Sequence, residues 1–118
     1  MDENGVRETL QKYFDAGNEA NGEKMREVFY PIAHLYSPGK DGTLINWDMD
    51  FFAARVSSTK LGFPPYNEII SIDFINEDAA AARVKVRVMD TLFTDILSLI
   101  RIDGKWKIIA KVFTGVPA

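Results

Sequence analysis

The spacing of apolar residues along the chain changes near Tyr66. Before this point, apolar and small residues recur every three or four positions in three short segments, a pattern typical of amphipathic helices. After it, apolar and polar residues alternate and turn sequences interrupt the alternation, which predicts antiparallel strands joined by hairpins. The chain is therefore predicted to fold as α+β, with three N-terminal helices followed by a four-stranded meander.

The helical half also contains a predicted hairpin. Asp48 is placed to cap the third helix, and Pro31 is expected to end the second, because the residue before a proline disfavours helical geometry. Residues 33–37 and 43–47 form the two arms of the hairpin, around the turn-rich residues 38–42. The apolar faces of the three helices are Val6, Leu10, Tyr13, Phe14 and Gly17, then Met25, Val28 and Phe29, then Met49, Phe52 and Val56.

Three turn sequences set the registers of the meander: residues 76–78, Asp90-Thr91 and Asp103-Gly104. These turns predict Ile72 opposite Ala82, Val86 opposite Asp95, Leu99 opposite Ile108 and Leu97 opposite Ala110. All three registers place the same residues on one face, and this agreement predicts a sheet with its helices packed there. That inward face is Ile70, Ile72, Phe74, Ala80, Ala82, Val84, Val86, Val88, Phe93, Asp95, Leu97, Leu99, Trp106, Ile108, Ala110 and Val112.

The opposite face of the predicted sheet mixes cations with branched apolar residues. One interpretation is a solvated face, on which the stems of lysine and arginine cover the isoleucines. The other is an interface between two copies of the chain, because an open sheet rarely exposes so many apolar side chains. We expect a homodimer centred on Ile96, Ile109 and Phe113, with Lys85 and Lys111 among the basic residues around them.

Composition narrows the classes of function. The 118 residues suit a single domain, residues 1–118, with no cysteine and one histidine. Disulfides, thiolate metal sites and cysteine nucleophiles are therefore excluded, and we expect no metal and no cofactor. The net charge of −3 argues against nucleic acid as a partner, and no apolar run approaches the ~20 residues of a membrane helix. A cytoplasmic protein with no membrane partner is expected.

This order of elements resembles the nuclear transport factor 2-like superfamily, whose members wrap a highly curved, mainly antiparallel sheet around the helices as a cone with a pocket. The closest resemblance is to small bacterial proteins labelled "Putative lumazine-binding". It covers essentially the whole chain, although Tyr30 and Ile32 depart from the residues more common there. The segments that carry it are Tyr13 with Asn21-Gly22-Glu23, Phe29-Tyr30-Pro31, Thr43-Leu44-Ile45-Asn46-Trp47, residues 93–99, residues 102–108 and Lys111-Val112-Phe113.

The same superfamily contains ketosteroid isomerase, whose oxyanion hole pairs a tyrosine with a carboxylic acid kept neutral by its apolar site. The resemblance places Tyr13 and Asp95 at these two positions. The aspartate base of that enzyme is replaced here by Ser37, before Pro38. A serine without a neighbouring histidine is too weak a base for a carbon acid. Isomerisation of the ketosteroid kind is therefore not expected.

Asp95 is the only acid on the predicted inward face, so it must either be protonated or find a donor. Because no cation is predicted nearby on that face, we expect a neutral acid that donates to a ligand; a buried polar tie to Tyr13 is the alternative. His34 points away from the pocket if Ser37 points inward, and in the opposite register it would be the natural general base. Trp47 and Phe51 could stack on a planar ligand or simply pack.

Three functions remain open. The first is a small-molecule-binding domain of unknown ligand, hydrophobic or aromatic, with no reaction. The second is an isomerase, dehydratase or cyclase in which Tyr13 and Asp95 stabilise an enolate, with His34 as a further catalytic candidate. The third is a non-catalytic oligomerisation or interaction module. The expected ligand-binding residues are Tyr13, Trp47, Phe52, Phe93, Asp95 and Leu97.

Overall fold

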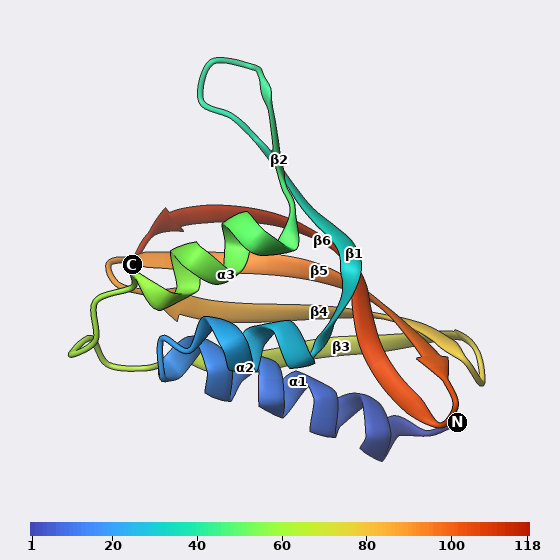
Figure 1. Ribbon diagram of the computed structural model, residues 1–118. Helices are drawn as coiled ribbons and strands as arrows, with labels where there is room; N and C mark the ends of the chain where they lie inside the picture. The colour runs from blue at the N-terminus through green and yellow to red at the C-terminus, as the bar shows by residue number, and fades with distance from the viewer.

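A computed structural model describes residues 1–118 as three helices and one six-stranded sheet. Figure 1 shows the helices on one face of the sheet, which curls around them, and the β1–β2 hairpin extending beyond the helical layer. The α+β architecture expected from the sequence is confirmed. The elements are α1 (Glu3–Asn18), α2 (Gly22–Glu27), β1 (Phe29–Pro38), β2 (Leu44–Trp47), α3 (Met49–Ser57), β3 (Asn67–Asn76), β4 (Ala79–Val88), β5 (Thr91–Ile102) and β6 (Lys105–Pro117).

The strands lie in the order β2-β1-β6-β5-β4-β3. All neighbours are antiparallel except β1 and β6, which run parallel. The core lies between the helices and the inward face of the sheet, as one cluster of 22 buried apolar residues. None of the three helices combines the length and the apolar character that crossing a membrane requires.

Side-chain caps define where the helices begin. Asp48 accepts a hydrogen bond from the backbone N–H of Phe51, so the cap predicted for the third helix is confirmed. The second helix ends at Glu27, earlier than predicted, and Phe29 already belongs to β1. Phe29 pairs with Ile108 of β6, which satisfies its backbone in the sheet and not in a helix.

Two departures from the predicted registers have different consequences. The β4–β5 turn falls at Met89 and Asp90, not at Asp90 and Thr91, so Asp95 lies opposite Val84. The shift is two residues, which equals the side-chain period of a strand, and every side chain keeps its predicted face. In β3, a bulge between residues 69 and 71 turns Ile70 outward, where it is 42% exposed.

A bulge in β6 inverts part of the predicted inward face. Leu99 lies opposite Ile108 as predicted, but Leu97 lies opposite Lys111 and not Ala110, because Ile109 is an extra residue between these pairs. Beyond the bulge, inward and outward positions exchange. Ala110 and Val112 therefore leave the core face, and Lys111 and Phe113 occupy it.

The same bulge corrects the expected dimer interface. Lys111 and Phe113 are each only 7% exposed, on the helix side of the sheet, so neither can form the centre or the rim of an interface on the other side. The remaining residues of that prediction are partly exposed on the outer face: Ile96, Ile109 and Lys85.

Candidate functional site

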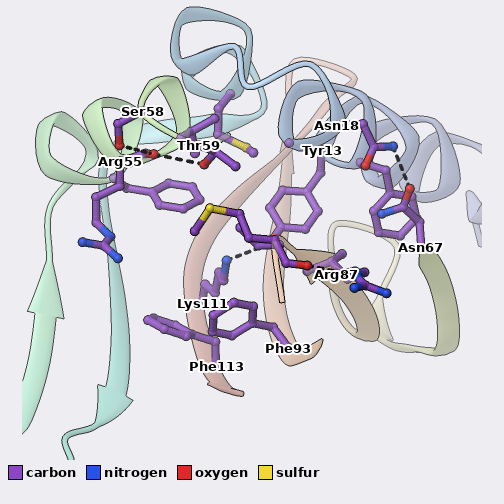
Figure 2. Close-up of a pocket in the computed structure, with 18 of the residues that line it drawn as sticks. Tyr13, Asn18, Arg55, Ser58, Thr59, Asn67, Arg87, Phe93, Lys111 and Phe113 are labelled. Carbon is purple, nitrogen blue, oxygen red and sulfur yellow. Dashed lines mark hydrogen bonds between the residues drawn. The ribbon is translucent and has the colours of Figure 1, made fainter. Parts of the chain in front are cut away.

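A cavity of about 200 Å³ lies between the helices and the sheet, beside the C-terminal turns of α1 and α3. Its wall is mainly apolar and aromatic. Figure 2 shows these side chains converging from separate elements. The lining includes Tyr13 and Phe14 from α1, Phe52, Arg55 and Val56 from α3, Trp47 from β2, and Val86, Phe93, Lys111 and Phe113 from the sheet.

Lys111 and Tyr13, at the floor of this cavity, form a buried hydrogen-bonded chain with Asp95 beneath it. The ammonium of Lys111 donates to the Tyr13 hydroxyl oxygen across 2.7 Å, and the hydroxyl donates to Oδ2 of Asp95 across 2.6 Å. Nζ of Lys111 lies 3.7 Å from the same carboxylate oxygen. The three residues are 7%, 3% and 0% exposed, and Oδ1 of Asp95 has no hydrogen-bond partner.

Aromatic rings surround the Lys111 ammonium. Its Nζ lies 4.7 Å from the ring centroid of Phe52, and 5.2 Å from those of Tyr13 and Phe113. The faces of such rings attract a cation, and the attraction increases where water is excluded. The amine is therefore held by one hydrogen bond, one carboxylate and three rings.

Burial shifts the titration of both donors in this chain. It lowers the pKa of the Lys111 ammonium, and the opposing attraction of Asp95 does not restore the ordinary value. Burial, reinforced by the charge of Asp95 and by the hydrogen bond to it, raises the pKa of the Tyr13 phenol well above its ordinary value. Tyr13 thus remains a neutral donor, and Lys111 reaches its neutral, nucleophilic form at a lower pH than an exposed lysine.

The expectation of an isolated neutral Asp95 rested on an inward face without cations. That premise is wrong, because the β6 bulge brings Lys111 beside the carboxylate. Asp95 and Leu97 are both fully buried and lie beneath the cavity wall, not in it. Any action of Asp95 on a ligand must therefore pass through Tyr13 or Lys111.

Two arginines that the sequence did not single out also line the cavity. The guanidinium of Arg55 lies 4.7 Å from the ring centroid of Trp47, and that of Arg87 donates to the backbone carbonyl of Met89. Neither takes part in a salt bridge with a carboxylate, unlike Arg26. Figure 2 shows Arg55 and Arg87 on opposite sides of the pocket. The cavity thus combines an apolar wall with an excess of positive charge.

The structure places the other predicted site residues as follows. Tyr13, Trp47, Phe52 and Phe93 all line the cavity, whereas Phe51 packs against Trp47 and is 48% exposed. Tyr13 is thus both a ligand-facing residue and a link between Lys111 and Asp95.

His34 lies outside the cavity. Its Nδ1 is 2.6 Å from Oδ1 of Asn46, and its ring stacks on Tyr36 with centroids 6.1 Å apart. Ser37 points inward, where its hydroxyl donates to the carbonyl of Phe113 across 2.6 Å. His34 therefore has no access to a ligand in the pocket. No group of three or more histidine, aspartate or glutamate side chains is arranged to hold a metal ion.

Comparisons with known proteins agree with this architecture. The sequence model of the family described as "Putative lumazine-binding" matches residues 1–114. A crystal structure of an NTF2-like protein of unknown function from Shewanella baltica superposes with a TM-score of 0.90 at 24% identity, covering 98% of this chain and 94% of that one. Another, from Methylobacillus flagellatus, gives a TM-score of 0.87 at 27% identity, covering 98% and 92%. The chain is also 27% identical over 117 residues to aldolase FrzH of Cladobotryum sp, covering 92% of this chain and 87% of the aldolase.

Proposed function

Because the chain belongs to the "Putative lumazine-binding" family, we propose that its cavity binds a small molecule, and that the ligand is a single-ring compound with a carbonyl oxygen and an anionic group. The observation that carries this proposal is the buried amine of Lys111 on the floor of an apolar cavity. Ligand sites typically combine an apolar wall with a few placed polar groups.

The size of the cavity limits the ligand. An apolar cavity of about 150 Å³ holds benzene, and drug-sized ligands occupy about 300–1,000 Å³. The present volume of about 200 Å³ therefore suits one ring with short substituents. The aromatic side chains Trp47, Phe52 and Phe93 provide flat surfaces for such a ring.

The polar groups specify what the substituents should be. The Tyr13 proton is committed to Asp95, so the N–H groups of Lys111 are the donors at the floor for a ligand oxygen. Arg55 and Arg87 have no carboxylate partner in the chain, and either one can bind an anionic group on its own side of the pocket, since a guanidinium group forms paired hydrogen bonds with a carboxylate. A ring that carries a carbonyl group at one end and a carboxylate at the other can bind both the Lys111 amine and an arginine.

The probe that tests this is 4-carbamoylbenzoate, whose amide carbonyl accepts hydrogen bonds but does not condense with amines. Titration followed by backbone amide NMR should give saturable shifts at residues lining the cavity. Benzamide, which lacks the carboxylate, should bind more weakly, and Lys111→Met should weaken 4-carbamoylbenzoate at least as much. Equal binding of both compounds, or shifts confined to other surfaces, would contradict the proposal.

We further propose that the protein is a homodimer that pairs through its outer sheet face. Supporting this are the partly exposed Ile96 and Ile109, together with Val112 and Ile102, which are 50% and 55% exposed on the same face. Light scattering should give twice the chain mass, and Ile96→Lys combined with Ile109→Glu should give a monomer. A dimer indifferent to both substitutions would rule out this face.

Enolate chemistry is a second candidate function. The observation that favours it is the charged amine of Lys111 in a water-poor pocket, where a donor at a developing oxyanion is most effective. The relative named an aldolase is consistent with carbonyl chemistry of this kind. Proton exchange at the methyl group of 4-acetylbenzoate in D₂O, followed by NMR, should be accelerated by the protein and not by Lys111→Met.

If no probe binds and the dimer persists, an interaction module is favoured.

A further inference from the structure

Lys111 differs from every other lysine of the chain. The other lysines are exposed or partly exposed, and only Lys111 is buried. It also lines the cavity, so a bound molecule can reach its amine. Arg55 and Arg87 lie at the rim of the cavity, where water still solvates them. A cation needed only to hold a ligand would lose less hydration free energy at such a position than at the buried position of Lys111.

We propose that Nζ of Lys111 condenses with an aldehyde or ketone bound in the cavity to form a Schiff base, so that the substrates of the site are small carbonyl compounds. This inference rests on the proposed function, because the carbonyl compound must first occupy the cavity. It goes beyond that function by making the contact with Lys111 covalent.

The hydrogen-bonded chain provides a route for the proton that the amine must lose. Lys111 donates to Tyr13, and Tyr13 donates to Asp95. A proton can pass from the ammonium to the Tyr13 oxygen while the hydroxyl proton passes to Oδ2 of Asp95. This transfer leaves a neutral amine, a neutral phenol and a protonated carboxyl group. The lowered pKa of Lys111, caused by its burial, favours the same transfer.

The chemical step is then balanced without any further reagent. The lone pair of the neutral amine forms a bond to the carbonyl carbon, the C=O π pair moves to oxygen, and one amine proton transfers to that oxygen to give a carbinolamine. The proton held by Asp95 returns through Tyr13 to the hydroxyl group, which leaves as water while the nitrogen lone pair forms the C=N bond. The product is a protonated Schiff base and one molecule of water, with Asp95 again ionised.

The surroundings of Lys111 also suit the product. A protonated Schiff base carries its positive charge at the former amine position. The rings of Phe52 and Phe113, whose centroids lie 4.7 and 5.2 Å from Nζ, remain available to that charge, and so does the carboxylate of Asp95. The exclusion of water from the apolar wall slows hydrolysis of the adduct.

Reductive trapping on the full chain tests the proposal. The protein is incubated near neutral pH with 4-carboxybenzaldehyde and cyanoborohydride, and the adducts are located by peptide mass mapping. Among the lysines we expect one fast adduct per chain, heavier by the mass of the aldehyde less one oxygen atom, and located at Lys111. Its rate should exceed that at Lys107, on the same strand, because burial lowers the pKa of the Lys111 ammonium and so increases the share of neutral amine there. Excess 4-carbamoylbenzoate should slow the fast phase.

Two variants provide matched controls. Lys111→Arg keeps a cation beside Asp95 but offers no amine that can condense, so the fast phase should disappear. Lys107→Arg should retain it. Because the mapping is done first on the unaltered protein, a variant that fails to fold does not remove the test.

The outcomes separate this inference from the proposed function. Adducts spread over several lysines at similar rates, with none favoured at Lys111, would overturn the Schiff base. If 4-carbamoylbenzoate still shifts the cavity resonances in that case, the binding proposal stands alone. Loss of both the selectivity and the shifts would overturn both.

Discussion

Replacing Asp95 with asparagine tests the charge pairing beneath the cavity. The substitution keeps the shape of the side chain and leaves an oxygen that accepts the hydrogen bond from Tyr13. It removes the negative charge that lies 3.7 Å from Nζ of Lys111. If Asp95 were an isolated neutral acid, as the sequence predicts, the fold would tolerate this substitution. In the structure Asp95 is paired with Lys111, so the substitution leaves the buried ammonium without a counter-charge.

The size of the effect follows from the geometry. Two unit charges about 4 Å apart attract by about 4 kcal/mol at an effective dielectric constant of about 20. Removing one partner of a buried pair typically costs about 3–5 kcal/mol. We therefore expect the free energy of unfolding of Asp95→Asn to be about 3–5 kcal/mol lower than that of the wild-type protein at pH 6.

Deprotonation of Lys111 limits this cost. In Asp95→Asn the carboxylate no longer opposes the effect of burial on Lys111. The pKa of Lys111 is therefore lower in the variant than in the wild-type protein. Between these two pKa values the folded variant has released a proton that the folded wild-type protein retains, while both unfolded chains still bind it. The variant then regains stability relative to the wild type by about 1.4 kcal/mol per pH unit.

Urea unfolding followed by tryptophan fluorescence between pH 6 and pH 9 measures this difference, with linear extrapolation to water. Asp73→Asn, at an exposed position on β3, is the matched control and should change stability by no more than about 0.5 kcal/mol. A cost below about 1 kcal/mol at pH 6, or one that does not shrink as pH rises, would refute the charged pair.

The remaining predictions concern the same cavity and the packing around it. Tyr13→Phe breaks the link between Lys111 and Asp95 and should lower the unfolding free energy by about 1–3 kcal/mol in urea titrations; a neutral result would mean that water replaces the hydroxyl. Gly115→Ala should cost about 1–3 kcal/mol and weaken 4-carbamoylbenzoate, since a Cβ there would lie 2.9 Å from the Phe93 ring; unchanged affinity would show that Phe93 moves without altering the cavity. Gly22→Ala should destabilise the α2–α3 contact without direct effect on the ligand, because its Cβ would meet the carbonyl oxygen of Ala53; thermal melts would detect the loss. Finally, the lowered pKa of Lys111 means that the unfolded chain binds one more proton than the folded chain at pH values between that pKa and 10.5. In this window the free energy of unfolding of the wild-type protein should therefore rise with pH, and that of Lys111→Met should not show this rise. Parallel pH profiles of the two proteins would contradict this prediction.

Turn chemistry carried much of the sheet prediction. Asp103-Gly104 pairs Ile102 with Lys105, as a two-residue turn requires, and the pairing of Leu99 with Ile108 follows from it. The predicted position of the β4–β5 turn was wrong by one residue, which shifts the pairing of the two strands by two residues. The predicted faces are still correct, because a shift of two residues preserves the alternation of side chains. Local sequence therefore determined which side of β4 and β5 faces the helices.

The floor of the cavity could not be derived in the same way. A bulge is visible in a sequence only where it breaks an alternation, and Ile108, Ile109 and Ala110 are all apolar. The pattern on either side of Ile109 is therefore compatible with both faces. The extra residue, Ile109, decides which face of the sheet Lys111 occupies, and therefore whether Asp95 has a cation beside it. Arg55 and Arg87 were missed because cations near the ends of elements usually face water.

NMR titration of the Lys111 side chain shows whether a buried amine of altered basicity forms the floor of a ligand cavity. Lysine side chains are labelled, and the Lys111 resonance is assigned from its loss in Lys111→Arg. We expect a midpoint below the ordinary value of 10.5, and a change of the resonance when 4-carbamoylbenzoate is added. A midpoint at or above 10.5, with a resonance that the probe does not change, would mean that the amine lies in water and that it does not form the floor of a ligand cavity.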